Sequence, residues 1–287
     1  MKIVTDCAAD LTKGEIEKFD IAVAPLYIQF PDGEVNAIDI SPDDFYERLK
    51  NMVPHIPTTA QPSAGTFTSI YKKITDLGEE IISIHISSGL SGTIESARLG
   101  AAQLPGKLVE IVDSLTLSGG ERFQVLAAAL GAKAGRRRED ILERLSKIRE
   151  ATEVIYTLET LEYLQRGGRI GRVQALAGSL LHLKPIICVE KSDGKYSTVG
   201  KMRTIPKALD SITNNIEKVY GNETPLWVSV LHGQLAEQAN NLAELVQKKL
   251  NVKKFEVMRI SPVLGVHTGP GIVGLAVVPI HLMEGLE

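Results

Sequence analysis

The sequence predicts an α/β protein of two domains, an N-terminal mainly parallel α/β sheet domain and a C-terminal α/β domain with a mixed or antiparallel sheet. In the first half, short segments rich in Ile and Val alternate with amphipathic stretches, which is the pattern of βαβ units. After about residue 155, strands of mixed alternation appear, with long helices between only some of them. No linker rich in Pro, Gly or Ser separates the halves, so we expect domains at 1–155 and 156–287 that pack closely.

Strands of the first domain are predicted at 2–6, 21–30, 80–87 and 107–113, where apolar runs end in polar or turn residues. Amphipathic helices are expected over 41–52, 64–78 and 120–135. Ser41 and Pro42 supply an N-cap and a first-turn residue for the first of these helices. In parallel sheets covered by helices, ligands bind at the C-terminal ends of the strands. The segments in that position are "TDCAADL" (5–11), "SSGLSGT" (87–93) and "DSLTLSGG" (113–120).

The second domain is predicted to combine short strands with two long helices. Strands are expected at 184–190, 195–203, 225–233, 254–261 and 271–280, and helices at 205–220 and 235–250. Between the first two strands, Asp193-Gly194 predicts a hairpin with a type I′ turn. The segment "VLGVHTGPG" (263–271) is expected to be a tight loop after a strand, because two glycines flank a proline there.

Composition excludes several functional classes. With 287 residues, 44% of them hydrophobic and 23% charged, the chain has the composition of a folded protein. Its net charge of −3 argues against a nucleic-acid-binding protein that works by bulk charge. One basic run, "KAGRRRED" (133–140), leads into a periodic stretch and is interpreted as the solvated start of a helix.

Neither metal binding nor export is predicted. Cys7 and Cys188 are far apart, and none of the 6 histidines lies in an HxH or HExxH pattern, so no metal site is expected. Charges at Lys2, Asp6 and Asp10 leave no room for a signal-peptide core. No apolar run reaches the roughly 18–20 residues needed to span a bilayer, and we therefore expect a cytoplasmic protein.

The segment "SSGLSGT" is a candidate anion site. It holds two glycines and four hydroxyl side chains where a strand is expected to turn into a helix. Helix N-termini leave N–H groups unpaired and attract anions, although the same residues also serve as simple helix caps. The Gly-Lys-[Ser/Thr] of a P-loop and the G-x-S-x-G of a hydrolase elbow are both missing around Ser91. The hydroxyls of "TTAQPS" (58–63) are, by themselves, most simply helix caps.

Two further motifs have both a structural and a functional interpretation. "RGGRIGR" (166–172), which contains Arg169, suggests phosphate binding, but is more simply a helix end stopped by two glycines. His267 and Thr268 lie in the predicted tight loop, and a lone histidine is more often a structural hydrogen-bonding group than a catalyst.

Taken together, these motifs closely resemble those of the DegV family. "TDCAADL", "TTAQPS", "SSGLSGT", "VDS", "TLEYLQRGGRIG", "KP" (184–185) and "GVHTGPG" occur in the family's order and spacing, from residue 3 to about residue 280. The resemblance implies two α/β domains with a long-chain fatty acid, of the palmitate or oleate class, bound between them. It also implies a likeness to the FakB subunits of bacterial fatty acid kinase, which present the acid to a separate ATP-dependent subunit.

The resemblance also implies roles for individual residues. It places the fatty acid carboxylate on Thr59 and Ser91, on N–H groups near Gly92 and Thr93, and beside His267 and Thr268. It places Arg169 and Arg203 near the head group and at the surface presented to the kinase. Cys7, Ala60 and Ile94 depart from the family's usual residues.

A carrier of this kind needs no cofactor and no catalytic activity of its own. The resemblance implies a role in phospholipid precursor metabolism. It also implies only transient membrane contact, for lipid exchange. Two alternatives remain open from the residues alone. One is a stand-alone lipid ester hydrolase with Ser91 as nucleophile and His267 as base. The other is a binding protein for another anionic lipid or metabolite.

Overall fold

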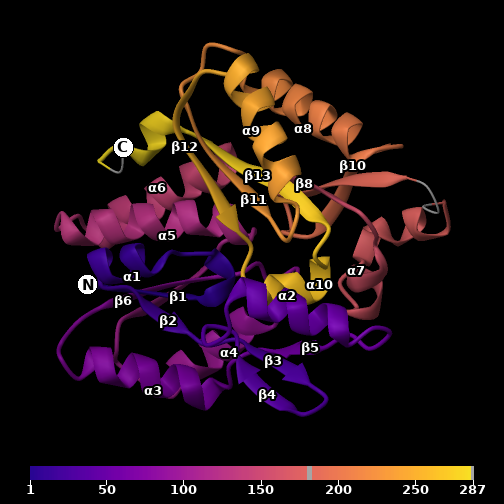
Figure 1. Cartoon of the computed structure of the whole chain (residues 1–287). Helices are drawn as coiled ribbons and strands as arrows, with labels where there is room; N and C mark the ends of the chain where they lie inside the picture. Colours follow the sequence, from indigo (N-terminus) through magenta and orange to yellow (C-terminus); the bar gives the residue numbers. More distant parts are fainter. Residues whose placement is uncertain (180–182, 286–287) are drawn as a thin grey trace.

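The computed structural model describes residues 1–179 and 183–285 and confirms an α/β fold with a parallel N-terminal and a mixed C-terminal sheet (Figure 1). The N-terminal sheet contains four parallel strands in the order β2-β1-β6-β7. Their bounds are β1 Lys2–Asp6, β2 Ala22–Ala24, β6 Ile81–His85 and β7 Val109–Asp113. Strand β6 is buried along its whole length because it is central and covered on both faces.

Helices cover both faces of this sheet. Helices α3 (Ala64–Thr75) and α4 (Thr93–Ala102) lie on one face, and α5 (Ser118–Lys133) lies on the other. Because α5 also packs against the C-terminal sheet, it is buried along most of its length. Helices α1 (Lys13–Phe19) and α6 (Arg138–Ala151) pack beside α5 in the same layer. The predicted helix start after the basic run is confirmed, since α6 begins at Arg138.

The single strand predicted over 21–30 is wrong. Only 22–24 forms β2 of the parallel sheet, and the chain then enters β3 (Tyr27–Phe30) of a separate antiparallel sheet. Pro25 lies between the two strands and has no N–H for a sheet hydrogen bond. The extra sheet has the order β4-β3-β5, with β4 at Gly33–Asn36 and β5 at Thr58–Ala60. The hydroxyls of residues 58 and 59 therefore lie on a strand, and Ser63 caps α3.

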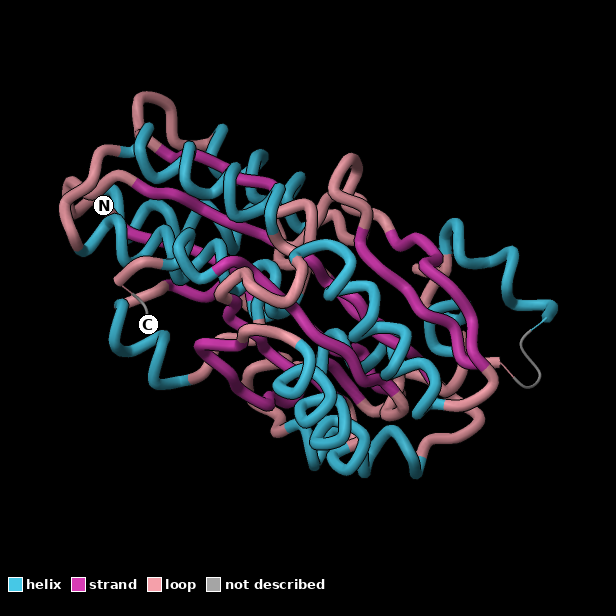
Figure 2. The backbone as a smooth tube through the Cα atoms, turned by 90° about the horizontal axis from the view of Figure 1, so that it is seen from above, coloured by secondary structure: helices cyan, strands magenta, loops and turns pink. Residues whose placement is uncertain are grey.

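The C-terminal sheet is mixed and has six strands in the order β10-β9-β8-β13-β11-β12. Only β11 and β12 pair in parallel, and every other neighbouring pair is antiparallel. The strands are β8 Glu153–Leu158, β9 Lys184–Val189, β10 Tyr196–Met202, β11 Leu226–His232, β12 Val252–Arg259 and β13 Ile272–Pro279. Helices α8 (Ile205–Tyr220) and α9 (Ala236–Lys249) lie over its outer face (Figure 2).

The hairpin between β9 and β10 is confirmed, but its predicted two-residue type I′ turn is wrong. The connection runs from Glu190 to Lys195, whose carbonyl accepts the Glu190 N–H at 2.9 Å. A type I′ turn needs two residues at positive φ, whereas here only Gly194 has one, at 63°. The hairpin tip is therefore a longer loop, which reaches the N-terminal domain.

The tight loop predicted over 263–271 is also wrong in its first part. Residues Pro262–Thr268 form the short helix α10, which begins after Ser261 and ends at Gly269. Pro262 stands in the first turn, where its missing N–H costs no hydrogen bond, and Gly269 has a φ of 72°. Helix α10 contacts α2 (Pro42–Asn51) and α7 (Glu162–Arg166).

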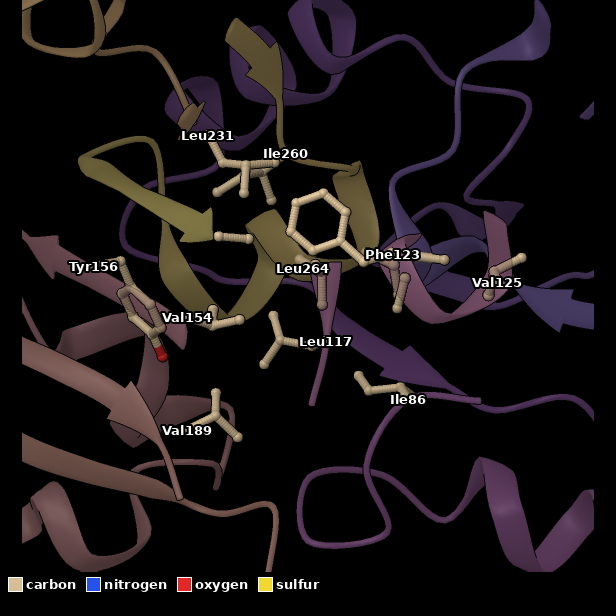
Figure 3. Packing of buried hydrophobic residues seen from close by; sticks show 14 of the residues in the cluster. Ile86, Leu117, Phe123, Val125, Val154, Tyr156, Val189, Leu231, Ile260 and Leu264 are labelled. Carbon is tan, nitrogen blue, oxygen red and sulfur yellow. The ribbon is translucent and has the colours of Figure 1, made fainter. Parts of the chain in front are cut away.

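The remaining short elements are 3-10 turns at η1 (Cys7–Ala9), η2 (Gly171–Ser179) and η3 (Ile280–Met283). One cluster of buried apolar residues connects the inner faces of both large sheets through α5 and α10. Figure 3 shows part of it, with Leu117, just before α5, and Val154, on β8, pointing toward the same space. The layers from one side to the other are helices, parallel sheet, α5 with its neighbours, mixed sheet and outer helices.

Candidate functional site

Three segments that are distant in sequence meet beside the end of the parallel sheet. Thr59 on β5 and His267 on α10 are joined by a hydrogen bond of 2.8 Å between Oγ1 and Nε2. Gln61, just after β5, donates from its carboxamide to Ser96 Oγ on α4 at 3.2 Å. Strand β5 therefore connects α10 on one side to the start of α4 on the other.

The loop between β6 and α4 carries the predicted anion motif and lies at the same place. Ser91 Oγ and Thr93 Oγ1 are 2.8 Å apart, and the Thr93 N–H donates to Ser91 Oγ at 3.3 Å. Gly92 precedes the first residue of α4, and a Cβ there would lie 2.5 Å from the Gln61 side chain. A larger residue at position 92 would therefore displace the end of the Gln61 side chain, which bonds to Ser96.

His267 is neutral at physiological pH. Burial, with a smaller effect of the positive charge on Arg169, lowers its pKa from 6.5 to about 4. Its Nδ1 atom is buried and has no hydrogen-bond partner among the described residues. An unpaired acceptor is tolerated better than an unpaired donor, so we place the proton on Nε2, as inferred from these contacts. His267 then donates to Thr59, which leaves the Thr59 hydroxyl hydrogen free for a ligand.

The other predicted residues lie at varying distances from this centre. Arg169 is half-buried, close enough to His267 to affect its pKa, and donates to the Gly167 carbonyl at 2.7 Å. Thr268 is buried and donates its hydroxyl to the Leu264 carbonyl at 3.1 Å, within its own helix. Arg203 is exposed, between β10 and α8, and no hydrogen bond or ion pair joins it to the described part of this site.

The hairpin tip of the C-terminal domain docks on the anion motif. Ser87 Oγ donates to the Gly194 carbonyl at 2.9 Å, and a Cβ on Gly89 would lie 2.5 Å from the Asp193 carbonyl oxygen. Sequence reasoning missed this role of Ser87 and Gly89, as well as the position of Gln61. The dipeptide Asp193-Gly194 marked the hairpin, but no local signal identified the surface that it contacts.

Thr268, the residue after His267, lines an apolar cavity that lies between the two domains. Its lining comes from α5, α10, three strands of the mixed sheet and the positions just before α5 and just after β12. It includes Leu117, Tyr156, Leu231, Ile260, Leu264 and Thr268. Several of these side chains converge in Figure 3. The space between the lining atoms amounts to at most about 350 Å³.

The contacts do not pair Ser91 with a base. Ser91 bonds to Thr93, whereas the imidazole of His267 bonds to Thr59. The second ring nitrogen of His267 meets no carboxylate in the described residues, so nothing orients the ring as in a catalytic triad. The sequence hypothesis of a serine hydrolase thus gains no support from this geometry.

A different Ser-His-Asp set lies on strands β1 and β6 of the parallel sheet, and its role is structural. His85 Nδ1 lies 3.0 Å from Asp6 Oδ2, and His85 Nε2 lies 2.7 Å from Ser83 Oγ, which also bonds to Tyr71 at 2.9 Å. All four side chains are buried, so no substrate reaches the serine. The set satisfies polar groups inside the core.

Residues 1–179 and 183–285 contain neither a metal-type cluster nor a membrane-type helix. Within those ranges, no group of three or more His, Cys, Asp or Glu side chains could hold a metal ion. In the same part of the chain, no helix combines the length and the apolar character that crossing a bilayer requires.

Comparison with known proteins gives a consistent result. Residues 1–280 match the family model described as "Uncharacterised protein, DegV family". A DegV domain-containing protein of Clostridium perfringens is 40% identical over 277 residues, which cover 96% of this chain and 97% of the relative.

Solved structures with the same fold include fatty acid-binding proteins. A fatty acid-binding DegV family protein from Thermus thermophilus is 30% identical, with a TM-score of 0.90 over 97% of this chain and 99% of the other. A stearic acid-binding protein from Eubacterium ventriosum is 27% identical, with a TM-score of 0.88 over 97% and 98% of the two chains. The chain described here belongs to the DegV family.

Proposed function

We propose that this protein binds one long-chain fatty acid between its two domains. The acyl chain enters the apolar cavity, and the carboxylate accepts hydrogen bonds from Thr59, Ser91 and the N–H groups near Gly92 and Thr93. The observation that carries the proposal is the bond between Thr59 and His267, because it leaves a hydroxyl donor beside α10, where the next residue, Thr268, lines the apolar cavity. The fatty acid-binding relatives support the same ligand class.

The energetics fit a ligand with a long tail and a small charged head. A palmitate-length chain has about 14 methylenes, and at ~0.8 kcal/mol each its burial contributes about 11 kcal/mol before any cost of ordering. Hydrogen bonds to the carboxylate contribute roughly 1.5–3 kcal/mol each, less the desolvation of the charge. The tail therefore dominates the affinity, and the polar residues orient the acid.

His267 and Arg169 have supporting roles in this proposal. Neutral His267 holds Thr59 in place by donating to its oxygen. The guanidinium of Arg169 lies near enough to lower the pKa of His267, and it supplies positive charge close to the bound carboxylate. Thr268 contributes the wall of the cavity next to the head group.

The wider role proposed here is that of a carrier in the cytoplasm. The bound acid is presented to the ATP-dependent subunit of a fatty acid kinase, which forms the acyl phosphate used for phospholipid precursors. Phosphoryl transfer needs bound ATP and magnesium, and this chain has no P-loop motif. The partner therefore supplies the nucleotide, and exposed Arg203 contacts it. Only transient contact with a membrane is needed to load the acid.

Native mass spectrometry of the protein purified from lipid-replete cells tests the proposal. The expected result is one fatty acid per chain, identified after solvent extraction. A phosphate ester in its place, or a fully lipid-free protein that also fails to bind added palmitate, would contradict it. Sustained hydrolysis of acyl esters that is lost in Ser91→Ala would instead favour the hydrolase.

A further inference from the structure

A second hollow opens on the surface, on the side of the domain interface formed by α1 and β12. It is lined mainly by apolar side chains, among them Leu11, Ile16, Val23, Ile40, Val257 and Met258. We call it the surface groove. Its space, with the open solvent at its mouth included, is about 1010 Å³. Two of its lining residues are unusually exposed for their type, Ile38 at 46% and Val257 at 40%.

The surface groove and the apolar cavity share a thin wall. Ser118 lines the cavity and donates its hydroxyl to Asp10, which lines the groove. The Ser261 N–H donates to the other oxygen of Asp10 at 2.9 Å, and Ser261 directly follows Ile260 of the cavity lining. Leu231 of the cavity pairs with Met258 of the groove across β11 and β12.

Two residues of this wall, Asp10 and Ser118, have an unusual backbone conformation. Asp10 has a φ of 52° and Ser118 a φ of 54°, although neither residue is glycine. Left-handed backbone at such residues is strained, and strain of this kind gathers at ligand-binding elements. The side-chain hydrogen bond from Ser118 to Asp10 is one of the contacts that separate the two spaces.

The cavity alone is too small for a long acyl chain. A methylene takes about the volume of a water molecule, roughly 30 Å³, so an acid of about 18 carbons needs roughly 500 Å³. The cavity provides at most about 350 Å³. The apolar space adjoining it at Ser118 is the surface groove, which is open and lined mainly by apolar side chains.

We propose that the surface groove holds the methyl end of long acyl chains, which leave the cavity past the Ser118–Asp10 hydrogen bond, and thereby extends the range of chain lengths bound. The inference rests on the proposed function, since it assumes that the carboxylate lies at Thr59. Rotation of the Ser118 side chain breaks its bond to Asp10, while Asp10 keeps the Ser261 N–H as a donor. Acids short enough for the cavity do not reach the groove.

The test compares acids of 12 and 18 carbons in variants that place a charge in the groove. Ile38→Glu and Val257→Glu change exposed side chains, so the fold should be kept, which thermal unfolding checks. Leu77→Glu and Val219→Glu are matched controls, because these residues are 79% and 54% exposed and lie outside the groove. Affinities are measured by displacement of a fluorescent fatty acid.

The inference predicts that each groove variant binds the 18-carbon acid about tenfold more weakly or worse, which corresponds to roughly 1.4 kcal/mol. Binding of the 12-carbon acid should stay within about twofold, and the controls should match the wild type for both acids. Equal affinities for the 18-carbon acid in groove variants and wild type, or equal losses for both acids, would overturn it. If the wild type binds neither acid, the proposed function itself fails.

Discussion

The imidazole of His267 and the hydroxyl of Thr59 form a 2.8 Å hydrogen bond, although they come from opposite ends of the chain. The bond joins α10 of the C-terminal half to β5 of the N-terminal half. Because burial keeps His267 neutral, its Nε2 hydrogen satisfies the Thr59 oxygen, and the Thr59 hydrogen is left to donate. Because Thr268, the neighbour of His267, lines the apolar cavity, we propose that this donor receives the acceptor end of the ligand.

Removing that donor should weaken binding of a fatty acid. Thr59→Val keeps the shape of the side chain but leaves part of the buried carboxylate unpaired, and we expect a loss of ~1–3 kcal/mol in binding free energy. Titration calorimetry with palmitate measures it. Thr59→Ser, which keeps the hydroxyl, should bind nearly as well as the wild type. The double variant Thr59→Val, Ser91→Ala should bind far worse, and wild-type affinity in that variant would remove both residues from the site.

His267 should make stability depend on pH. In the folded state its pKa is about 4, whereas the ordinary value is 6.5, so the unfolded chain binds the proton first as the pH falls. The contribution of neutral His267 is complete above pH 6.5 and is lost as the pH falls toward 4, by about 3 kcal/mol in total.

Urea unfolding of the wild type and of His267→Gln at a series of pH values measures this contribution. As the pH falls from 6.5 to 4, the wild type should lose more unfolding free energy than His267→Gln does. A difference that stays constant over this range would show that His267 titrates normally in the folded protein.

Asp10 should change stability with pH in the direction opposite to that of His267, over nearly the same pH range. Burial raises its pKa from 3.8 to about 6, despite the donors from Ser118 and Ser261. The folded state then holds a proton that the unfolded state has lost, so stability falls as the pH rises from 3.8 to 6, by about 3 kcal/mol. Asp10→Asn removes this titration, and its stability relative to the wild type should therefore increase from pH 4 to pH 6. A decrease would contradict the buried, protonated carboxyl.

Arg203 should matter for the kinase and not for the ligand. It is exposed and lies apart from the Thr59–His267 pair, so Arg203→Ala should bind palmitate like the wild type. When a fatty acid kinase subunit and ATP are added, the variant should form little acyl phosphate, because a surface cation that helps to dock the partner is lost. Lys201→Ala, at an exposed position two residues earlier, serves as the control. Normal turnover by Arg203→Ala would make Arg203 an ordinary surface residue.

Much of the fold could be predicted because hydrophobic period and turn residues are local signals. The strands beginning at Lys2, Ile81 and Leu226 and the long helices α8 and α9 were found in this way. The split at Pro25 shows the limit, since a run of apolar residues does not say which sheet each part joins. Helix α10 was missed because seven residues between Pro262 and Gly269 carry too little periodicity to separate a helix from a loop.

The candidate site was less predictable from local pattern. Hydroxyls and glycines in "SSGLSGT" marked an anion site, yet the partners of that loop, Gln61 and Gly194, come from distant segments. The residues that line the cavity could not be predicted from the sequence either, because they too come from distant segments. A leucine such as Leu117 or Leu264 has the same local pattern whether it faces a cavity or packs in the core.

The central claim is that a fatty acid carboxylate lies at Thr59 and Ser91, and ¹³C NMR of bound palmitate labelled at its carboxyl carbon tests it most directly. The account predicts one bound carboxyl resonance, which shifts in Thr59→Val and in Ser91→Ala while the acid stays bound. Thr198→Val, at an exposed position on β10, should leave the resonance unchanged. A carboxyl resonance that is identical in the wild type and in both site variants would contradict the claim.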